Sequence, residues 1–122
     1  MVDLPPGTGD IQLTLAQKAR VSGAIIVTTP QDIALLDAVK GIEMFRTVEI
    51  PVIGLVENMS VHTCSNCGHR EHLFGEGGGG EVARRYETQL LAELPLSGSI
   101  RELSDKGTPP VLSDPDGEVA QI

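Results

Sequence analysis

The sequence has little of what nucleic-acid-binding and membrane proteins need. It contains no tryptophan, one tyrosine and two phenylalanines, so it offers no stacking platform for single-stranded bases. Nine Lys and Arg residues against seventeen Asp and Glu residues give a net charge of −8, and no basic stripe is present to contact phosphates or an anionic membrane. No apolar run reaches the roughly eighteen residues of a transmembrane helix. We therefore expect a soluble acidic domain that binds neither nucleic acid nor membrane.

Cysteine is also scarce, which limits the disulfides and metal sites that the chain can form. The only two cysteines are Cys64 and Cys67, too few for a disulfide framework. The N-terminus has neither the basic segment nor the apolar stretch of a signal peptide, so we expect a cytoplasmic protein. In that reducing compartment, a Cys-x-x-Cys pair more often binds a metal or acts in redox chemistry than forms a structural disulfide.

Two thiols cannot complete a tetrahedral metal site, which needs four ligands. Either His69 and His72 complete a zinc module, or a second copy of the chain brings its own cysteines and an iron–sulfur cluster lies between them. Four ligands within nine residues would strain the loop, so we favour solvated histidines. A thioredoxin-like redox role requires the cysteines at a helix N-terminus, whereas Gly68 and His69 follow Cys67.

Two apolar, β-branched runs predict strands of a parallel sheet. Residues 23–29 and 52–57 are continuous runs, as in strands that are buried on both faces. Between them, residues 31–47 carry apolar side chains at helical spacing, which predicts an amphipathic crossover helix. A strand, a helix and a strand in this order predict a βαβ unit. The fold class is therefore α/β, with a parallel sheet flanked by helices.

The remaining segments predict shorter elements. We expect a helix over residues 11–19, a flexible glycine-rich loop over 75–81, helical structure over 82–91 and a strand over 90–96. Residues 97–106 have a Ser cap and a closing glycine, which predict a helix. The tail over 108–117 is predicted to be extended and turn-rich, and a helix begins at Glu118.

Polar residues at two loops indicate a ligand site, because open parallel sheets bind ligands beyond the carboxyl ends of their strands. Asn58, which follows the second strand, is suited either to contact a nucleobase or to form a turn with its own backbone. Near the N-terminus, Asp3 precedes a Gly/Pro loop that ends at Asp10. Such a loop either holds a magnesium-bound water beside a nucleotide or forms an ordinary turn.

The motifs taken together resemble the Mrp-type iron–sulfur cluster carrier ATPases, a branch of the P-loop NTPases related to MinD and ParA. The matching segments are DLPPGTGD at 3–10, TPQDIALLDAVKG at 29–41, GLVENMS at 54–60, CSNCG at 64–68, FGEGG at 74–78 and DPD at 114–116. Their order and spacing cover nearly the whole chain. The resemblance implies a Rossmann-like three-layer fold, with residues 1–122 as one partial P-loop NTPase domain and a Cys-x-x-Cys insertion at about 59–80.

The resemblance also implies a role for each matched residue. On the nucleotide side, Asp3 would order Mg²⁺ in the Walker B position, Gly7 to Asp10 would form the switch loop that senses the γ-phosphate of ATP, and Asn58 would contact adenine. On the other side, Cys64 and Cys67 would ligate a [4Fe–4S] cluster that bridges a homodimer. ATP binding and hydrolysis would be coupled to transfer of the cluster to apo iron–sulfur proteins.

The chain departs from this family in lacking any Gly-Lys pair. Family members begin with a glycine-rich P-loop whose lysines hold the phosphates, whereas this chain starts at the Asp-x-Pro-Pro-Gly loop. We therefore expect an N-terminally incomplete fold that does not hydrolyse ATP alone, and whose unpaired apolar strand edge promotes self-association. A positioning ATPase of the MinD or ParA type remains an alternative, although the basic patch or amphipathic helix that it needs is absent.

Overall fold

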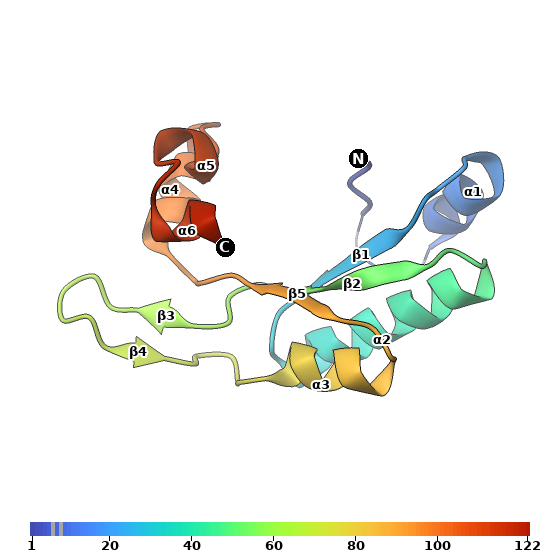
Figure 1. Cartoon of the computed structure of the whole chain (residues 1–122), viewed down its shortest axis with the longest axis horizontal. Helices are drawn as coiled ribbons and strands as arrows, with labels where there is room; N and C mark the ends of the chain where they lie inside the picture. Colours follow the sequence, from blue (N-terminus) through green and yellow to red (C-terminus); the bar gives the residue numbers. More distant parts are fainter. Residues whose placement is uncertain (6, 8) are drawn as a thin grey trace.

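The computed structural model describes residues 1–5, 7 and 9–122. A parallel three-stranded sheet has the order β1 (Ala24–Thr28), β2 (Val52–Glu57) and β5 (Leu90–Glu93). Helices α2 (Asp32–Thr47) and α3 (Gly78–Arg85) pack against it. Figure 1 shows both helices along one side of the sheet. The predicted α/β class and the β1–α2–β2 unit are confirmed.

Two groups of elements lie beyond the carboxyl ends of the strands (Figure 1). The first is a hairpin of β3 (His62–Thr63) and β4 (Arg70–Glu71), which carries the cysteine segment. The second contains α4 (Gly98–Asp105), α5 (Pro110–Ser113) and α6 (Glu118–Gln121). Helix α1 (Asp10–Lys18) lies at the opposite end of the sheet. No helix in the described ranges is long and apolar enough to cross a membrane.

The apolar core lies between the sheet and the two packed helices. Ile26 on β1, Leu55 on β2 and Ile42 on α2 are among its buried side chains. Burying each such side chain contributes about 1.5–3 kcal/mol to folding. The predicted amphipathic face of α2 is confirmed, because Ala38, Ile42 and Phe45 are buried on it.

The prediction that β1 is buried on both faces is wrong. Its side chains alternate, and Ile25 and Val27 are 48% and 64% exposed. Ile25 pairs with Gly54, and a Cβ at Gly54 would lie 2.6 Å from Leu91 Cγ. Ile25 and Leu91 therefore share one face, which α2 and α3 do not cover because both pack on the other. Of the three layers that the resemblance implies, the described residues supply the sheet and one helical layer.

The glycine-rich stretch is a packed helix N-terminus and not the flexible loop that we predicted. Helix α3 starts at Gly78, directly after Gly77 with φ +73°. A Cβ at Gly78 would lie 2.5 Å from Leu35 Cδ1, and one at Gly79 would lie 2.8 Å from Glu57 Oε2. Glycine is required because α2 and β2 approach the backbone of α3 so closely.

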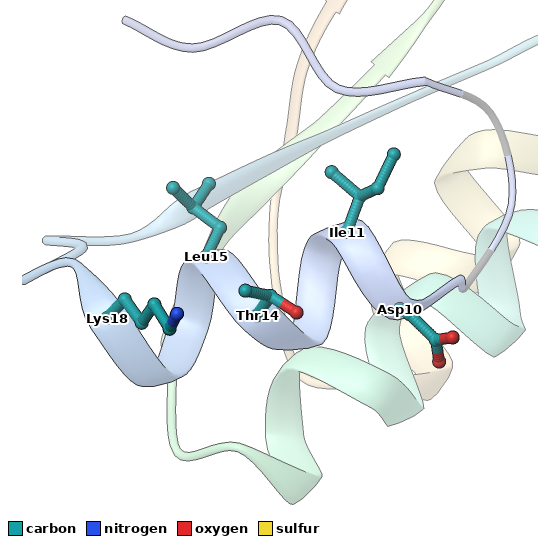
Figure 2. Close-up of a pocket in the computed structure, with 5 residues that line it drawn as sticks. All are labelled: Asp10, Ile11, Thr14, Leu15 and Lys18. Carbon is teal, nitrogen blue, oxygen red and sulfur yellow. The ribbon is translucent and has the colours of Figure 1, made fainter.

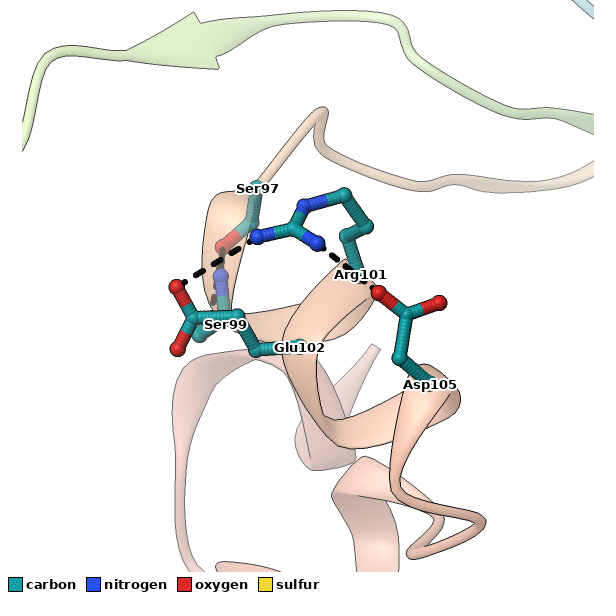
Figure 3. A network of polar contacts seen from close by, with 5 residues as sticks. All are labelled: Ser97, Ser99, Arg101, Glu102 and Asp105. Atoms are coloured by element: carbon teal, nitrogen blue, oxygen red, sulfur yellow. Dashed lines mark hydrogen bonds and ion pairs between the residues drawn. The ribbon is translucent and has the colours of Figure 1, made fainter.

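The C-terminal elements follow the sequence with two corrections. Ser97 Oγ accepts a hydrogen bond from the Ser99 N–H at 3.3 Å and caps α4 as predicted. Figure 3 shows that cap beside the ion pair of Arg101 with Asp105, at 2.8 Å. The predicted helix over 82–91 ends early, at Arg85, because the chain turns with positive φ at Glu87 and enters β5. The tail is not fully extended, because α5 forms within it.

Candidate functional site

The cysteine hairpin is attached to the end of the sheet by a small set of polar contacts. Ser60 is buried, and both its N–H and its Oγ donate to the Leu94 carbonyl, at 2.9 and 3.1 Å. His72 Nδ1 donates to the Ser60 carbonyl at 2.7 Å. His72 Nε2 lies 3.8 Å from Glu76 Oε1. These contacts hold the base of the hairpin against the segment that follows β5.

A tight backbone turn brings the two cysteines together at the tip of the hairpin. The Cys64 N–H donates to the His69 carbonyl at 2.8 Å, and the Gly68 N–H donates to the Cys64 carbonyl at 2.9 Å. Gly68 has φ +72°, a conformation that glycine adopts without strain. Cys64 is half-buried and Cys67 exposed, and both are free thiols. The turn thus presents two sulfur atoms side by side at the protein surface.

The turn also favours the thiolate form of Cys64. The backbone N–H of Cys67, then that of Asn66, and then the Cys67 thiol donate to the Cys64 sulfur and lower its pKa below the ordinary value. Partial burial and the charge of Glu71 oppose this effect and raise the pKa. Because the thiolate is the form that binds metals, the folded turn prepares Cys64 as a ligand.

We expect alkylation of Cys64 to show this shift directly. In the metal-free chain, labelling by iodoacetamide should reach half its maximal rate at a lower pH than in the same chain unfolded in urea. The folded pKa is the lower one, so the thiolate stabilises the fold above the unfolded pKa, and this contribution is lost as the pH falls through the folded pKa. Site-resolved mass spectrometry across pH measures both midpoints. Equal midpoints would contradict the hydrogen bonding of Cys64.

The four ligands of the alternative zinc site, Cys64, Cys67, His69 and His72, are not placed together around a metal position. Within residues 1–5, 7 and 9–122, no group of three or more His, Cys, Asp or Glu side chains is placed to hold a metal ion. His72 instead ties the base of the hairpin, and His69 contributes its backbone carbonyl to the turn. Cys64 and Cys67 are therefore the candidate ligands that remain, and their binding of a metal stays a prediction. A tetrahedral centre needs two more from outside this chain.

Asn58 lies at the carboxyl end of β2, as the sequence predicted. Its N–H donates to the Thr28 carbonyl at 2.7 Å, and its Oδ1 accepts from the Met59 N–H at 2.9 Å. Met59 has φ +58°. The Oδ1 contact bonds the side chain to its own backbone at the next residue, and not two residues on as in an Asn turn. It also fixes the orientation of the amide at the sheet end, and the contact to adenine stays a prediction.

The other predicted nucleotide residues lie near the N-terminus, away from the cysteines. Asp3 is exposed and lies in no strand. Gly7 has φ +93°, and its carbonyl accepts from Gln12 Nε2 at 2.8 Å. The same Nε2 donates to the Pro5 carbonyl at 2.9 Å, so the buried Gln12 holds both sides of the loop. Positions 6 and 8 of the predicted switch loop lie outside the described residues.

Asp10 begins α1 and borders a pocket of about 410 Å³. Figure 2 shows its lining, in which Ile11 and Leu15 point to the same side of the helix. No hydrogen bond or ion pair among the described residues joins Asp3 or Asp10 to Asn58 or to the cysteines. Helix α1, which begins at Asp10, lies at the opposite end of the sheet from the cysteine hairpin (Figure 1).

Sequence reasoning did not predict the contacts that Gln12, Glu57 and His72 make in these segments. Gln12 and Glu57 are polar residues at buried positions. The position of Glu57 at the end of an otherwise apolar strand marks it as a polar strand-end residue but does not reveal its partner, the Gly79 N–H. The partners of His72 and Gln12 are backbone carbonyls, and no side-chain pattern in the sequence reveals them.

Comparison with known proteins gives consistent matches over the chain. The family model described as ParA, NUBPL iron-transfer P-loop NTPase, matches residues 1–122. An iron-sulfur cluster carrier protein of Pseudomonas fragi is 64% identical over 122 residues, which are all of this chain and 42% of that protein. The mouse iron-sulfur cluster transfer protein NUBPL is 53% identical over 121 residues, which are 99% of this chain and 38% of that protein.

Solved structures agree with the sequence matches. A nucleotide-binding protein from Archaeoglobus fulgidus, solved in complex with ADP, is 45% identical with a TM-score of 0.74. The alignment covers 85% of this chain and 43% of that one. The chain thus spans well under half the length of the relatives it matches. Since the family model covers the chain from end to end, the chain belongs to the ParA/NUBPL family of iron-transfer P-loop NTPases.

Proposed function

We propose that this chain carries an iron–sulfur cluster as cargo, binds it through Cys64 and Cys67 and passes it to apo iron–sulfur proteins. The observation that carries the proposal is the cysteine turn, in which backbone N–H groups lower the pKa of Cys64. The turn lies at the exposed tip of a short hairpin. A cargo held at an exposed tip is accessible to an acceptor protein. The printed names of the relatives from Pseudomonas fragi and mouse agree with this role.

The cluster is of the [4Fe–4S] type and lies between two copies of the chain. Each chain offers two thiols, and such a cluster takes four cysteine ligands. A symmetric homodimer that joins through Cys64 and Cys67 supplies them. Because each subunit contributes only two ligands, release to an acceptor breaks two bonds on each side. Labile binding of this kind suits transfer better than storage.

The nucleotide side of the proposal rests on Asp3, Gly7, Asp10 and Asn58, with ATP and Mg²⁺ as ligands. The relative from Archaeoglobus fulgidus is a nucleotide-binding protein solved with ADP. This chain lacks a Gly-Lys pair, so it has no lysine of the P-loop type for the β- and γ-phosphates. ATP hydrolysis by this chain alone is therefore outside the proposed function. The cytoplasm is the proposed location, because the thiols must remain reduced.

Anaerobic reconstitution with iron and sulfide tests the cargo proposal. We expect about four irons and four sulfides per dimer, because two pairs of cysteines complete one cluster. Reconstitution should add a dimer joined through the cysteines, and removing the cluster with a chelator should return the protein to the association state of the cluster-free chain. Iron and sulfide assays combined with mass measurement in solution give the ratio. One zinc per monomer with no change in association would contradict the proposal.

A further inference from the structure

Glu57 is a buried acidic residue to which the proposed function gives no task. It ends β2 and is only 1% exposed. It lies in register with Thr28 on one side and Glu93 on the other, at the carboxyl end of the sheet. An acidic side chain this deeply buried needs a polar partner to offset the loss of water.

The partner of Glu57 is the N-terminus of α3. Glu57 Oε2 accepts a hydrogen bond from the Gly79 N–H at 2.6 Å. The residue in the N-cap position of α3 is Gly77, which has no side chain to act as a cap. Glu57 takes that role from a different element, and the positive end of the helix dipole favours a carboxylate there. A Cβ at Gly79 would lie 2.8 Å from Glu57 Oε2 and 3.2 Å from Glu57 Cβ, so a side chain there would force Glu57 to move.

This contact joins the two ends of the cysteine segment. Glu57 is the last residue before the chain leaves the sheet, and Gly79 lies in the first turn of the helix to which it returns. Between them are the hairpin and both cysteines, and the bonds of Ser60 to Leu94 and of His72 to Ser60 lie just inside this closure. The bond between Glu57 and Gly79 therefore closes the loop at its base.

We propose that Glu57 is a positioning residue for the cysteine site, which holds the hairpin in place by capping α3 from β2. This inference rests on the proposed cargo function, since it concerns how firmly the cluster is held. Glu57 touches neither cysteine in the described contacts and acts through the backbone of the hairpin. When the cap is lost, the two ends of the segment separate more often, and the paired cysteines release the cluster faster.

Four variants separate positioning from a general contribution to folding. Glu57→Ala removes the acceptor, and Gly79→Ala forces the two groups apart. Glu57→Gln keeps an oxygen that can accept the Gly79 N–H and should rescue the effect. Gly80→Ala is the matched control, because a Cβ at Gly80 meets only Leu90 Cδ2, at an ordinary 3.9 Å.

Amide hydrogen exchange in the cluster-free chain gives the first measurement. We compare the Ser60 N–H at the base of the hairpin with the Leu55 N–H, which donates to the Gln89 carbonyl within the sheet. In Glu57→Ala and Gly79→Ala, Ser60 should exchange about tenfold faster relative to Leu55, since losing the buried hydrogen bond between Glu57 and Gly79 favours local opening. Glu57→Gln and Gly80→Ala should stay within about twofold of the wild type. A general loss of stability would instead accelerate both amides equally.

The rate at which a chelator removes iron from the reconstituted protein gives the second measurement. Glu57→Ala and Gly79→Ala should bind the wild-type amount of iron and lose it about tenfold faster, while Glu57→Gln and Gly80→Ala lose it at the wild-type rate. Wild-type release in Glu57→Ala, or equal acceleration in Glu57→Gln, would overturn the inference. If the wild type binds no cluster, the cargo proposal fails, and the exchange of Ser60 relative to Leu55 alone decides the role of Glu57.

Discussion

Replacing either Cys64 or Cys67 with serine should reduce the iron content of the reconstituted protein from about four per dimer to background, because four thiolates complete the proposed cluster. A serine hydroxyl stays protonated at neutral pH and is a poor ligand for iron. Because the proposed dimer is symmetric, one substitution removes two of the four ligands. The dimer should therefore be lost together with the cluster. Iron assay, visible absorbance and mass in solution measure the effect.

The matched controls for these variants are His69→Ala and His72→Ala. The His69 side chain is exposed, and His72 is tied to the Ser60 carbonyl, so neither should change the amount of iron bound. His72→Ala removes one bond at the base of the hairpin and leaves the cysteine turn in place. A zinc module would give the opposite pattern, in which either histidine variant loses the metal. Loss of iron in His69→Ala would therefore contradict the cysteine-only site.

A lysine at position 27 should convert a self-associating cluster-free chain into a monomer. Val27 lies on β1, at the edge of the described sheet, and is 64% exposed. An apolar edge strand with unpaired N–H and C=O groups templates pairing with another chain. The charge of Val27→Lys must be desolvated in any such pairing, so association becomes unfavourable. Sedimentation or light scattering over a range of protein concentrations gives the measurement.

Leu36→Lys is the matched control for this experiment. Leu36 is 58% exposed, close to the value for Val27, but it lies on helix α2. It therefore introduces the same charge at a similarly exposed apolar residue away from the strand edge. The association should persist in this variant. If Leu36→Lys disperses the oligomers as well as Val27→Lys does, net charge is the cause and the strand edge is not.

The elements with a local pattern were predictable from the sequence. The bounds of α2 and β2 agree with the prediction within one residue, because helical spacing and β-branched runs are local signals. The glycine-rich stretch was misinterpreted as flexible because the residues that pack against its glycines are distant in the sequence. Gly78 and Gly79 are required by Leu35 and Glu57, which lie far away in the chain. Composition alone indicates flexibility, and only the packing shows the constraint.

In the candidate site, too, some features could be predicted from the sequence and others depend on the folded conformation. Cys64 and Cys67 could be proposed as ligands from the sequence, because a Cys-x-x-Cys pair has few uses in a reducing compartment, and this role stays a prediction. The exposure of Ile25 was not predictable, since an apolar run looks the same whether one face or both are covered. The lowered pKa of Cys64 depends on the backbone N–H groups of the turn. Its cause is therefore a conformation, which the residue types do not reveal.

The cysteine hairpin contributes no apolar side chain to the core. The core cluster and the side chains packed against it include none from residues 58–77 in the described chain. Heat denaturation followed by the helical signal therefore reports mainly on the sheet and its helices and gives little information on the hairpin that carries Cys64 and Cys67. A substitution that disrupts only the cysteine hairpin should therefore leave the melting temperature and the solubility nearly unchanged. Substitutions at the exposed tip of the hairpin should therefore have little effect on the melting temperature.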